Sequence, residues 1–125
     1  MKQARVIGIA PQLIVPDVNR TVMYYHDILG FNIIALVQDP PVYGMVERDG
    51  FQIHFAKSDH ATIHANHHLR SIAHDFILWV PEIDVFYTEL TSRGVTILQT
   101  IVQRVYGSRE FVFEDCDGHR ILVGD

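Results

Sequence analysis

Three histidines, His60, His64 and His68, are spaced four residues apart. On a helix this spacing would place the three imidazoles on one face, where they could chelate zinc or nickel. The alternative is that residues 59–68 form a linker that carries ordinary surface histidines. We favour the linker, because a segment between folded units is where surface histidines are common, and we therefore expect no physiological metal there.

The single cysteine, Cys116, lies between Asp115 and Asp117. Two neighbouring carboxylates disfavour the thiolate, so we do not expect Cys116 to act as a nucleophile. One cysteine cannot form an internal disulfide, which fits a reducing compartment. The sequence shows no signal-peptide pattern, and no apolar run reaches the roughly 18–20 residues of a membrane span. These features predict a cytoplasmic protein.

The composition is that of one small globular domain. The chain has 125 residues, of which 48% are hydrophobic, enough for a core without disulfides. Its 15 acidic and 10 basic residues give a formal net charge of -5, and no stretch concentrates lysine and arginine. Nucleic acid and acidic membranes are therefore poor partners, and a small molecule is the expected one.

The elements that position these residues recur in two copies. Three pairs of segments match in the same order at spacings of about 65 residues, too regular a series for chance. The paired segments are residues 13–18 and 78–83, 29–33 and 93–97, and 49–55 and 117–123. We therefore predict one domain of two modules, residues 6–57 and 74–125, joined by a linker over residues 58–73.

Each module shows the pattern of one helix packed on a four-stranded sheet. An apolar strand ends at valine, proline and an acid, which favours a helix start. Gly30 and Gly94 stand where a left-handed residue would end each helix, and turn signals separate the later strands. One helix covers only one face of a sheet. We therefore expect an α+β fold in which the two curved sheets meet face to face around a cup.

Three motifs carry a resemblance to a known family. They are Val15-Pro16-Asp17, the helix end Leu29-Gly30-Phe31, and residues 107–113 leading into an Asp-x-x-Gly turn at residues 115–118. The chain resembles the vicinal oxygen chelate superfamily, in particular its glyoxalase and bleomycin-resistance branch. The resemblance implies paired βαβββ modules, a cup between curved sheets, and a homodimer in which modules from different chains complete the cups.

The enzymes of that superfamily hold a divalent metal at four equivalent strand positions. Carried onto this sequence, these positions are Ala10, His54, Asp75 and Leu122, with His74 as the alternative to Asp75 after a one-residue shift. Alanine and leucine cannot bind a metal. Two remaining ligands fall short of the three that catalytic zinc or iron usually has.

Strand alternation predicts which side chains line the cup. If Asp75 faces inward, Ile77 and Trp79 follow it, and on the last strand of module one Gln52 and His54 do the same. Arg109 and Glu110 precede a strand of module two and could reach a ligand at the mouth of the cup, while Tyr43 and Tyr106 precede inner strands and could form a lid. Each has a structural alternative: Trp79 in a core, His54 as a satisfied inner histidine, and Arg109 and Glu110 in a cross-strand ion pair.

The leading hypothesis is a metal-independent protein without enzymatic activity that binds a small aromatic or amphipathic molecule, as bleomycin-resistance proteins do. The alternative is an enzyme of the glyoxalase or extradiol dioxygenase kind. It would hold zinc, nickel, manganese or iron through His54, Asp75 or His74, and Glu110, and the metal would polarise adjacent ligand oxygens. A third possibility is a module that regulates a partner protein.

Overall fold

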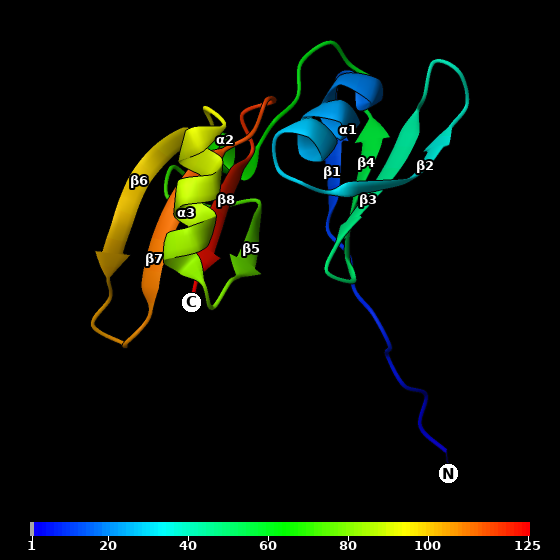
Figure 1. Ribbon diagram of the computed structural model, residues 1–125. Coiled ribbons are helices and arrows are strands. Elements are labelled where there is room, and N and C mark those ends of the chain that lie inside the picture. Colours follow the sequence, from blue (N-terminus) through cyan, green and yellow to red (C-terminus); the bar gives the residue numbers. More distant parts are fainter. Residues whose placement is uncertain (1) are drawn as a thin grey trace.

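The computed structural model describes residues 2–125 and shows two similar halves joined by a linker (Figure 1). The first half contains β1 (Gln12–Val15), α1 (Val18–Asp27), β2 (Asn32–Val37), β3 (Tyr43–Arg48) and β4 (Phe51–Lys57). The linker carries the short α2 (Asn66–Leu69). The second half contains β5 (Phe76–Trp79), α3 (Ile83–Ser92), β6 (Thr96–Gln103), β7 (Arg109–Glu114) and β8 (Arg120–Gly124).

The two sheets have the same topology. The strand order is β1-β4-β3-β2 in the first sheet and β5-β8-β7-β6 in the second. The outer pair β1 and β4, like β5 and β8, is parallel, and the other neighbours are antiparallel. This correspondence confirms the predicted α+β fold of two βαβββ modules.

Each helix buries one apolar stripe against its own sheet. In α1 the buried residues include Val18, Val22 and Tyr25, and in α3 they include Ile83 and Leu90. The Asp17 side chain accepts a hydrogen bond from the backbone N–H of Arg20 at 3.1 Å, which satisfies a free donor in the first turn of α1. Both helices end before a glycine with a φ of 76°, as the sequence predicts for residues 30 and 94.

The modules are joined by the turn between β7 and β8, which packs on α1. Asp117 accepts hydrogen bonds from the Arg20 guanidinium at 2.8 Å and from the Thr21 hydroxyl. Asp115 accepts one from the buried Tyr25 hydroxyl at 2.7 Å. Burying a polar group without a partner costs about 1–3 kcal/mol, so these bonds fix the turn on the helix.

The opposite turn, between β3 and β4, makes the matching contact with α3. Arg48 forms a two-pronged ion pair with Glu89 at 2.8 and 3.0 Å, and it also donates to the carbonyl of Leu29 at 2.7 Å. Arg93 donates to the carbonyl of Ile28 at 3.0 Å. Both inter-module contacts therefore pair a hairpin turn of one module with the helix side of the other.

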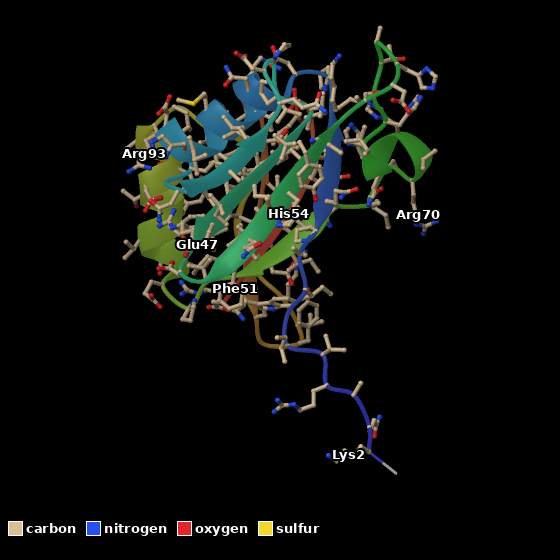
Figure 2. All side chains as sticks on the ribbon, turned by 90° about the vertical axis from the view of Figure 1, so that its right-hand side faces the viewer. Lys2, Glu47, Phe51, His54, Arg70 and Arg93 are labelled. Carbon is tan, nitrogen blue, oxygen red and sulfur yellow. The ribbon has the colours of Figure 1, made fainter. Side chains whose placement is uncertain are left out.

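This docking corrects one expectation from the sequence. The two sheets of one chain do not meet face to face, because the modules contact each other through their helices and hairpin turns. The face of each sheet opposite its helix points away from the other module, as Figure 2 shows for the first sheet around His54. On these faces Ile14 is 45% exposed, Ile77 44% and Trp79 72%. We call these two surfaces the open faces.

Two further findings concern the start of the first module and the linker. Pro11 lies just before the first strand, which begins at Gln12, because a proline has no N–H for the ladder; its carbonyl still accepts from the backbone N–H of His54 at 3.0 Å. His60 and His64 lie outside any helix, since only Asn66–Leu69 is helical in that segment. The three spaced histidines therefore do not share a helix face.

Residues 2–125 include no helix of the length and apolar character that a membrane crossing requires.

Buried His119 gives the fold a testable pH dependence. Burial alone lowers the pKa of this imidazole, but the ion pair of its Nδ1 with Asp115, 3.4 Å away, and the charges of Asp75 and Asp117 outweigh it and raise the pKa above 6.5. The folded state therefore favours the protonated form. This stabilisation is fully present below pH 6.5 and is lost as the pH rises through the folded-state pKa.

We expect the free energy of unfolding of the wild type, relative to that of His119→Gln, to fall as the pH rises above 6.5. Each pKa unit of difference between the folded and unfolded states contributes about 1.4 kcal/mol. Urea denaturation from pH 5.5 to 9 measures both proteins. A difference between them that stays constant over this range would contradict the ion pair.

Candidate functional site

The open face of the first sheet is a grid of side chains fixed by the strand register. One row pairs Gln12 with His54, Met45 and Ala35, and the next pairs Ile14 with Ala56, Tyr43 and Val37. A third row holds Gln52, Glu47 and Asn32. The alternate residues Ile53 and Phe55 are buried beneath the helix, so polar groups on this sheet gather on the open face.

A chain of hydrogen bonds crosses the middle of this face. The Gln12 amide donates to the Tyr43 hydroxyl at 2.9 Å, and that hydroxyl lies 2.7 Å from Nδ1 of His54. Nε2 of His54 lies 2.8 Å from Oε1 of Gln52, an acceptor. The network thus assigns the His54 proton to Nε2 and makes Nδ1 the acceptor of the Tyr43 hydroxyl. Both imidazole nitrogens are occupied, and His54 is a satisfied, hydrogen-bonded group.

The open face of the second sheet is built the same way and is more apolar at its centre. Its middle row pairs Gln99, Val112, Leu122 and Ile77. The row towards the C-terminal end of β5 pairs Val102, Glu110, Gly124 and Trp79. The row at the other end holds Thr96, Glu114 and Arg120. Leu122 occupies the place that His54 has in the first sheet.

Trp79 has an open surface beside it. Its partner in the register is Gly124, which has no side chain, and a Cβ placed on that glycine would lie 3.8 Å from Cδ1 of Trp79 and 3.9 Å from Cγ of Glu110. The indole is therefore next to bare backbone, and the Glu110 side chain lies on the other side of Gly124 in the same row. An exposed indole in this position can stack on a flat ligand.

Glu110 is the nearly buried carboxylate of this row, with 9% of its side chain exposed. It accepts a hydrogen bond from the Tyr106 hydroxyl, which raises the pKa of that phenol, and it pairs with the Arg104 guanidinium at 3.5 Å. Arg104 also donates to Oε1 of Gln99 at 3.3 Å. Glu110 thus connects two residues of the β6–β7 connection to the sheet.

Arg109 lies apart from these residues. It forms ion pairs with Asp84 in α3 at 2.8 Å and with Asp125 at 3.0 Å, on the helix side of the sheet. Its neighbour Glu110 pairs with Arg104 on the open face instead. The two adjacent residues therefore bind different partners on opposite faces, as strand alternation requires.

Asp75 is committed to the backbone. One carboxylate oxygen accepts from the N–H of Asn66 at 2.9 Å and the other from the N–H of Arg120 at 2.9 Å. The carbonyl of His74 accepts from the Asn66 amide at 3.0 Å. These bonds attach α2 to the start of β5 and β8, so Asp75 has a structural role here.

The four positions implied by the resemblance do not fit a divalent metal in this chain. Ala10 and Leu122 offer no ligand atom, both nitrogens of His54 are hydrogen-bonded, and both oxygens of Asp75 accept backbone N–H groups. A metal would have to displace these bonds and would still lack a third protein ligand. Within residues 2–125, neither His74 nor Glu110 joins them in a group of three neighbouring ligands.

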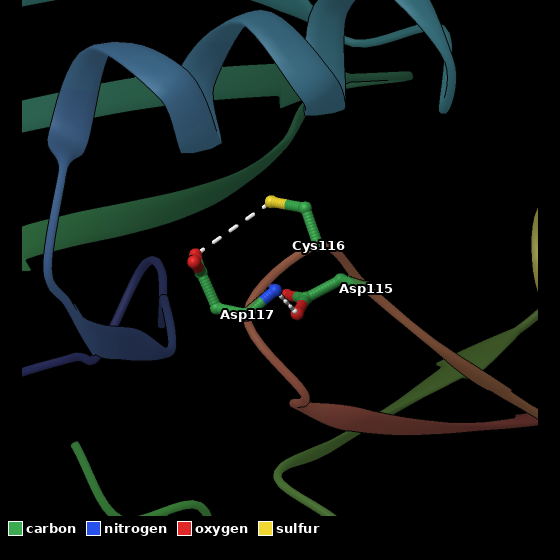
Figure 3. A group of neighbouring side chains, drawn as sticks. All are labelled: Asp115, Cys116 and Asp117. Carbon is green, nitrogen blue, oxygen red and sulfur yellow. Dashed lines mark hydrogen bonds between the residues drawn. The ribbon is translucent and has the colours of Figure 1, made fainter. Parts of the chain in front are cut away.

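The group of three potential ligands that does lie together in residues 2–125 is Asp115, Cys116 and Asp117, whose ligand atoms fall within 4.8 Å (Figure 3). Asp115 accepts from the Tyr25 hydroxyl and from the backbone N–H of Asp117, and Asp117 binds Arg20 and Thr21 of α1. The carboxylates are therefore used to hold the modules together. This cluster is structural.

Sequence reasoning did not identify Gln12 and Arg104, and it considered Tyr43 as part of a lid and not as a partner of His54. Gln12 and Tyr43 contact His54 from neighbouring strands, and only the strand register brings the three together. Arg104 lies six residues before Glu110 across a turn, a separation that matches the two arms of a hairpin. A β-hairpin predicted with its turn at Gly107 would have placed residues 104 and 110 close to each other on its two arms and indicated that contact.

A sequence model described as the Glyoxalase/Bleomycin resistance protein/Dioxygenase superfamily matches residues 6–123, nearly the whole chain. The chain belongs to this superfamily. The resemblance inferred from the Val-Pro-Asp and Asp-x-x-Gly motifs is thereby confirmed. No curated protein matches the chain at a significant level.

Solved structures of the superfamily share the fold. A member from Sphaerobacter thermophilus DSM 20745 has a TM-score of 0.77 at 22% identity, covering 96% of this chain and 97% of its own. UcmS2 has a TM-score of 0.76 at 21% identity, with coverages of 98% and 99%. TioX from Micromonospora sp. ML1 has a TM-score of 0.75 at 17% identity, with coverages of 94% and 96%. At these identities the likeness establishes the fold.

Cys116 supplies a prediction about reactivity. Burial, together with the charges of Asp117 and Asp115, raises the pKa of its thiol to about 12. Because the thiolate is the reactive form, alkylation by iodoacetamide at pH 8 should be about a thousandfold slower than in the protein unfolded by urea. Mass spectrometry of timed samples measures both rates. The alkylation of free glutathione, measured in parallel, shows that the reagent is equally active under both conditions. Similar rates in the folded and unfolded protein would contradict this account of the turn.

Proposed function

We propose that this chain is a metal-independent binding protein that holds a small aromatic or amphipathic molecule on its open faces, in the manner of bleomycin-resistance proteins. The observation that carries the proposal is the second open face. It offers a largely exposed tryptophan beside a glycine, with the apolar Ile77 and Leu122 in the adjacent row. Such a surface suits a flat, partly polar organic ligand.

The residues at the superfamily's four metal-ligand positions support binding that does not depend on a metal. Two of the four positions hold apolar residues, and the two that could bind a metal are bound to other protein groups. His54 then serves as a hydrogen-bonding group that orients Tyr43 and Gln52. In this proposal the ligand is recognised by shape, stacking and hydrogen bonds, and the single cysteine supports a reducing, cytoplasmic location.

The outward orientation of the open faces supports a homodimer. Each face is a half-exposed four-stranded surface, and two copies of the chain could cover a first sheet with a second sheet to form two equivalent cups. The N-terminal arm, which we define as residues 2–11, extends away from the molecule in Figure 1. In it Val6, Ile7 and Ile9 are at least 90% exposed, and such apolar side chains favour burial against a second copy.

Metal content and ligand binding test the proposal together. Tag-free protein, purified without nickel and without chelator, should contain well under one metal ion per dimer by plasma mass spectrometry. A small-molecule collection should then include aromatic compounds that quench the fluorescence of Trp79, the single tryptophan of the chain. Saturable quenching identifies binders, and His54→Ala should keep ligand affinity within about fivefold because His54 supplies hydrogen bonds worth about 1 kcal/mol.

The alternative metal enzyme has the opposite signature. Near-stoichiometric zinc, iron, manganese or nickel that disappears in His54→Ala would contradict the proposal. Glyoxalase and dioxygenase assays would then follow.

The arm provides a separate test of the dimer. Replacing Ile7 and Ile9 by serine should shift the protein towards monomer, because each buried isoleucine contributes about 1.5–3 kcal/mol to association. Multi-angle light scattering over a dilution series measures the change. Lys2→Ser with Arg5→Ser is the matched control in the same arm and should leave the mass unchanged. A wild-type protein that is monomeric at all concentrations would rule out the dimer.

A further inference from the structure

Two exposed aromatic side chains border one buried carboxylate at the end of the second open face. Trp79 lies beside Glu110 across Gly124, and Tyr106 donates its hydroxyl to Glu110 from the β6–β7 connection. Trp79 is 72% exposed and Tyr106 68%, whereas the Glu110 side chain is 9% exposed. Because most of each ring is exposed, a ligand can contact either of them.

This combination of groups has a specific chemical preference. The faces of tryptophan and tyrosine rings carry negative electrostatic potential and attract cations, and quaternary ammonium groups are recognised by such aromatic surroundings. A carboxylate with little exposure to water strengthens that attraction, because its charge is poorly screened. A neutral ring system alone would have no use for the carboxylate.

The protein already holds a cation at this place, and holds it weakly. The Arg104 guanidinium contacts Glu110 at 3.5 Å and Gln99 at 3.3 Å, both long for hydrogen bonds, and 39% of its side chain is exposed. By contrast, Arg48 binds Glu89 with two bonds of 2.8 and 3.0 Å. Arg104 can therefore move aside into water and leave the carboxylate to a cation of the ligand.

We propose that Trp79, Tyr106 and Glu110 form a subsite for an organic cation, a quaternary ammonium or protonated amine attached to an aromatic group, with Arg104 as the side chain that such a ligand displaces. The inference rests on the proposed binding function and adds the charge of the ligand to it. The formal net charge of -5 favours the approach of a cation over that of an anion.

A pair of isosteric probes isolates the charge. 4-(Trimethylammonio)benzyl alcohol and 4-tert-butylbenzyl alcohol have the same shape, and only the first is a cation. Isothermal titration calorimetry of the whole protein should give at least about tenfold tighter binding of the cation, in line with the strength of desolvated cation–aromatic contacts. Benzoate serves as the anionic probe and should bind more weakly than either.

Three variants assign the preference to the subsite. Glu110→Gln should reduce the affinity for the cation to that for the neutral probe and leave the neutral probe unchanged. Glu114→Gln is the matched control, since it removes the same charge from the same strand and the same face, beside Arg120. The Glu114→Gln variant should still bind the cationic probe more tightly than the neutral probe, by nearly the same factor as the wild type. Arg104→Gln should bind the cation about threefold more tightly, because no resident guanidinium has to be displaced.

The outcomes separate this inference from the binding function. Equal affinities for the cation and the neutral probe would overturn the cation subsite and leave aromatic binding intact. If the preference for the cation over the neutral probe were lost equally in Glu110→Gln and Glu114→Gln, the subsite would also be overturned. The preference would then result from the overall charge of the protein. If none of the three probes binds at 10 mM, the subsite is refuted, and the fluorescence screen decides the binding function by itself. Circular dichroism and thermal melting confirm that each variant is folded.

Discussion

The arrangement of the molecule depends on one buried polar contact, the β7–β8 turn seated on α1. Two carboxylates in that turn, Asp115 and Asp117, accept from Tyr25, Thr21 and Arg20, and their desolvation is offset only in this geometry. The contact fixes the helix side of one module against the hairpin end of the other. It therefore also decides that both open faces turn outward, where a ligand or a second copy of the chain can reach them.

The same contact explains why three potential metal ligands lie together in one turn. Asp115, Cys116 and Asp117 lie close together because a tight turn with Gly118 at a φ of 83° folds them onto one another, and α1 then supplies the donors. The groups suited to ligand recognition are on the open faces instead. There His54 has both nitrogens bound, while Trp79 and Tyr106 remain exposed around Glu110. The proposed recognition of a ligand by stacking and charge rests on that distribution.

Much of the fold could be predicted from the sequence, because the repeat and the helical spacing are local signals. The buried residues Val18, Val22, Ile83 and Leu90 recur at helical spacing in the sequence, and strand alternation placed Trp79 and His54 on the face opposite their helices. The docking of the modules could not be predicted, since it depends on contacts such as Arg20 with Asp117, 97 residues apart. For the same reason Asp75 was counted as a potential ligand: its two backbone partners, residues 66 and 120, meet it only after folding.

The most direct test of the account is the dependence of ligand affinity on metal. The dissociation constant of a compound that quenches Trp79 should be the same before and after exhaustive dialysis against EDTA, and Trp79→Leu should weaken binding of the same compound when measured by calorimetry. Binding that is lost with EDTA and restored by zinc, iron, manganese or nickel would contradict the account and identify the chain as a metal-dependent member of its superfamily.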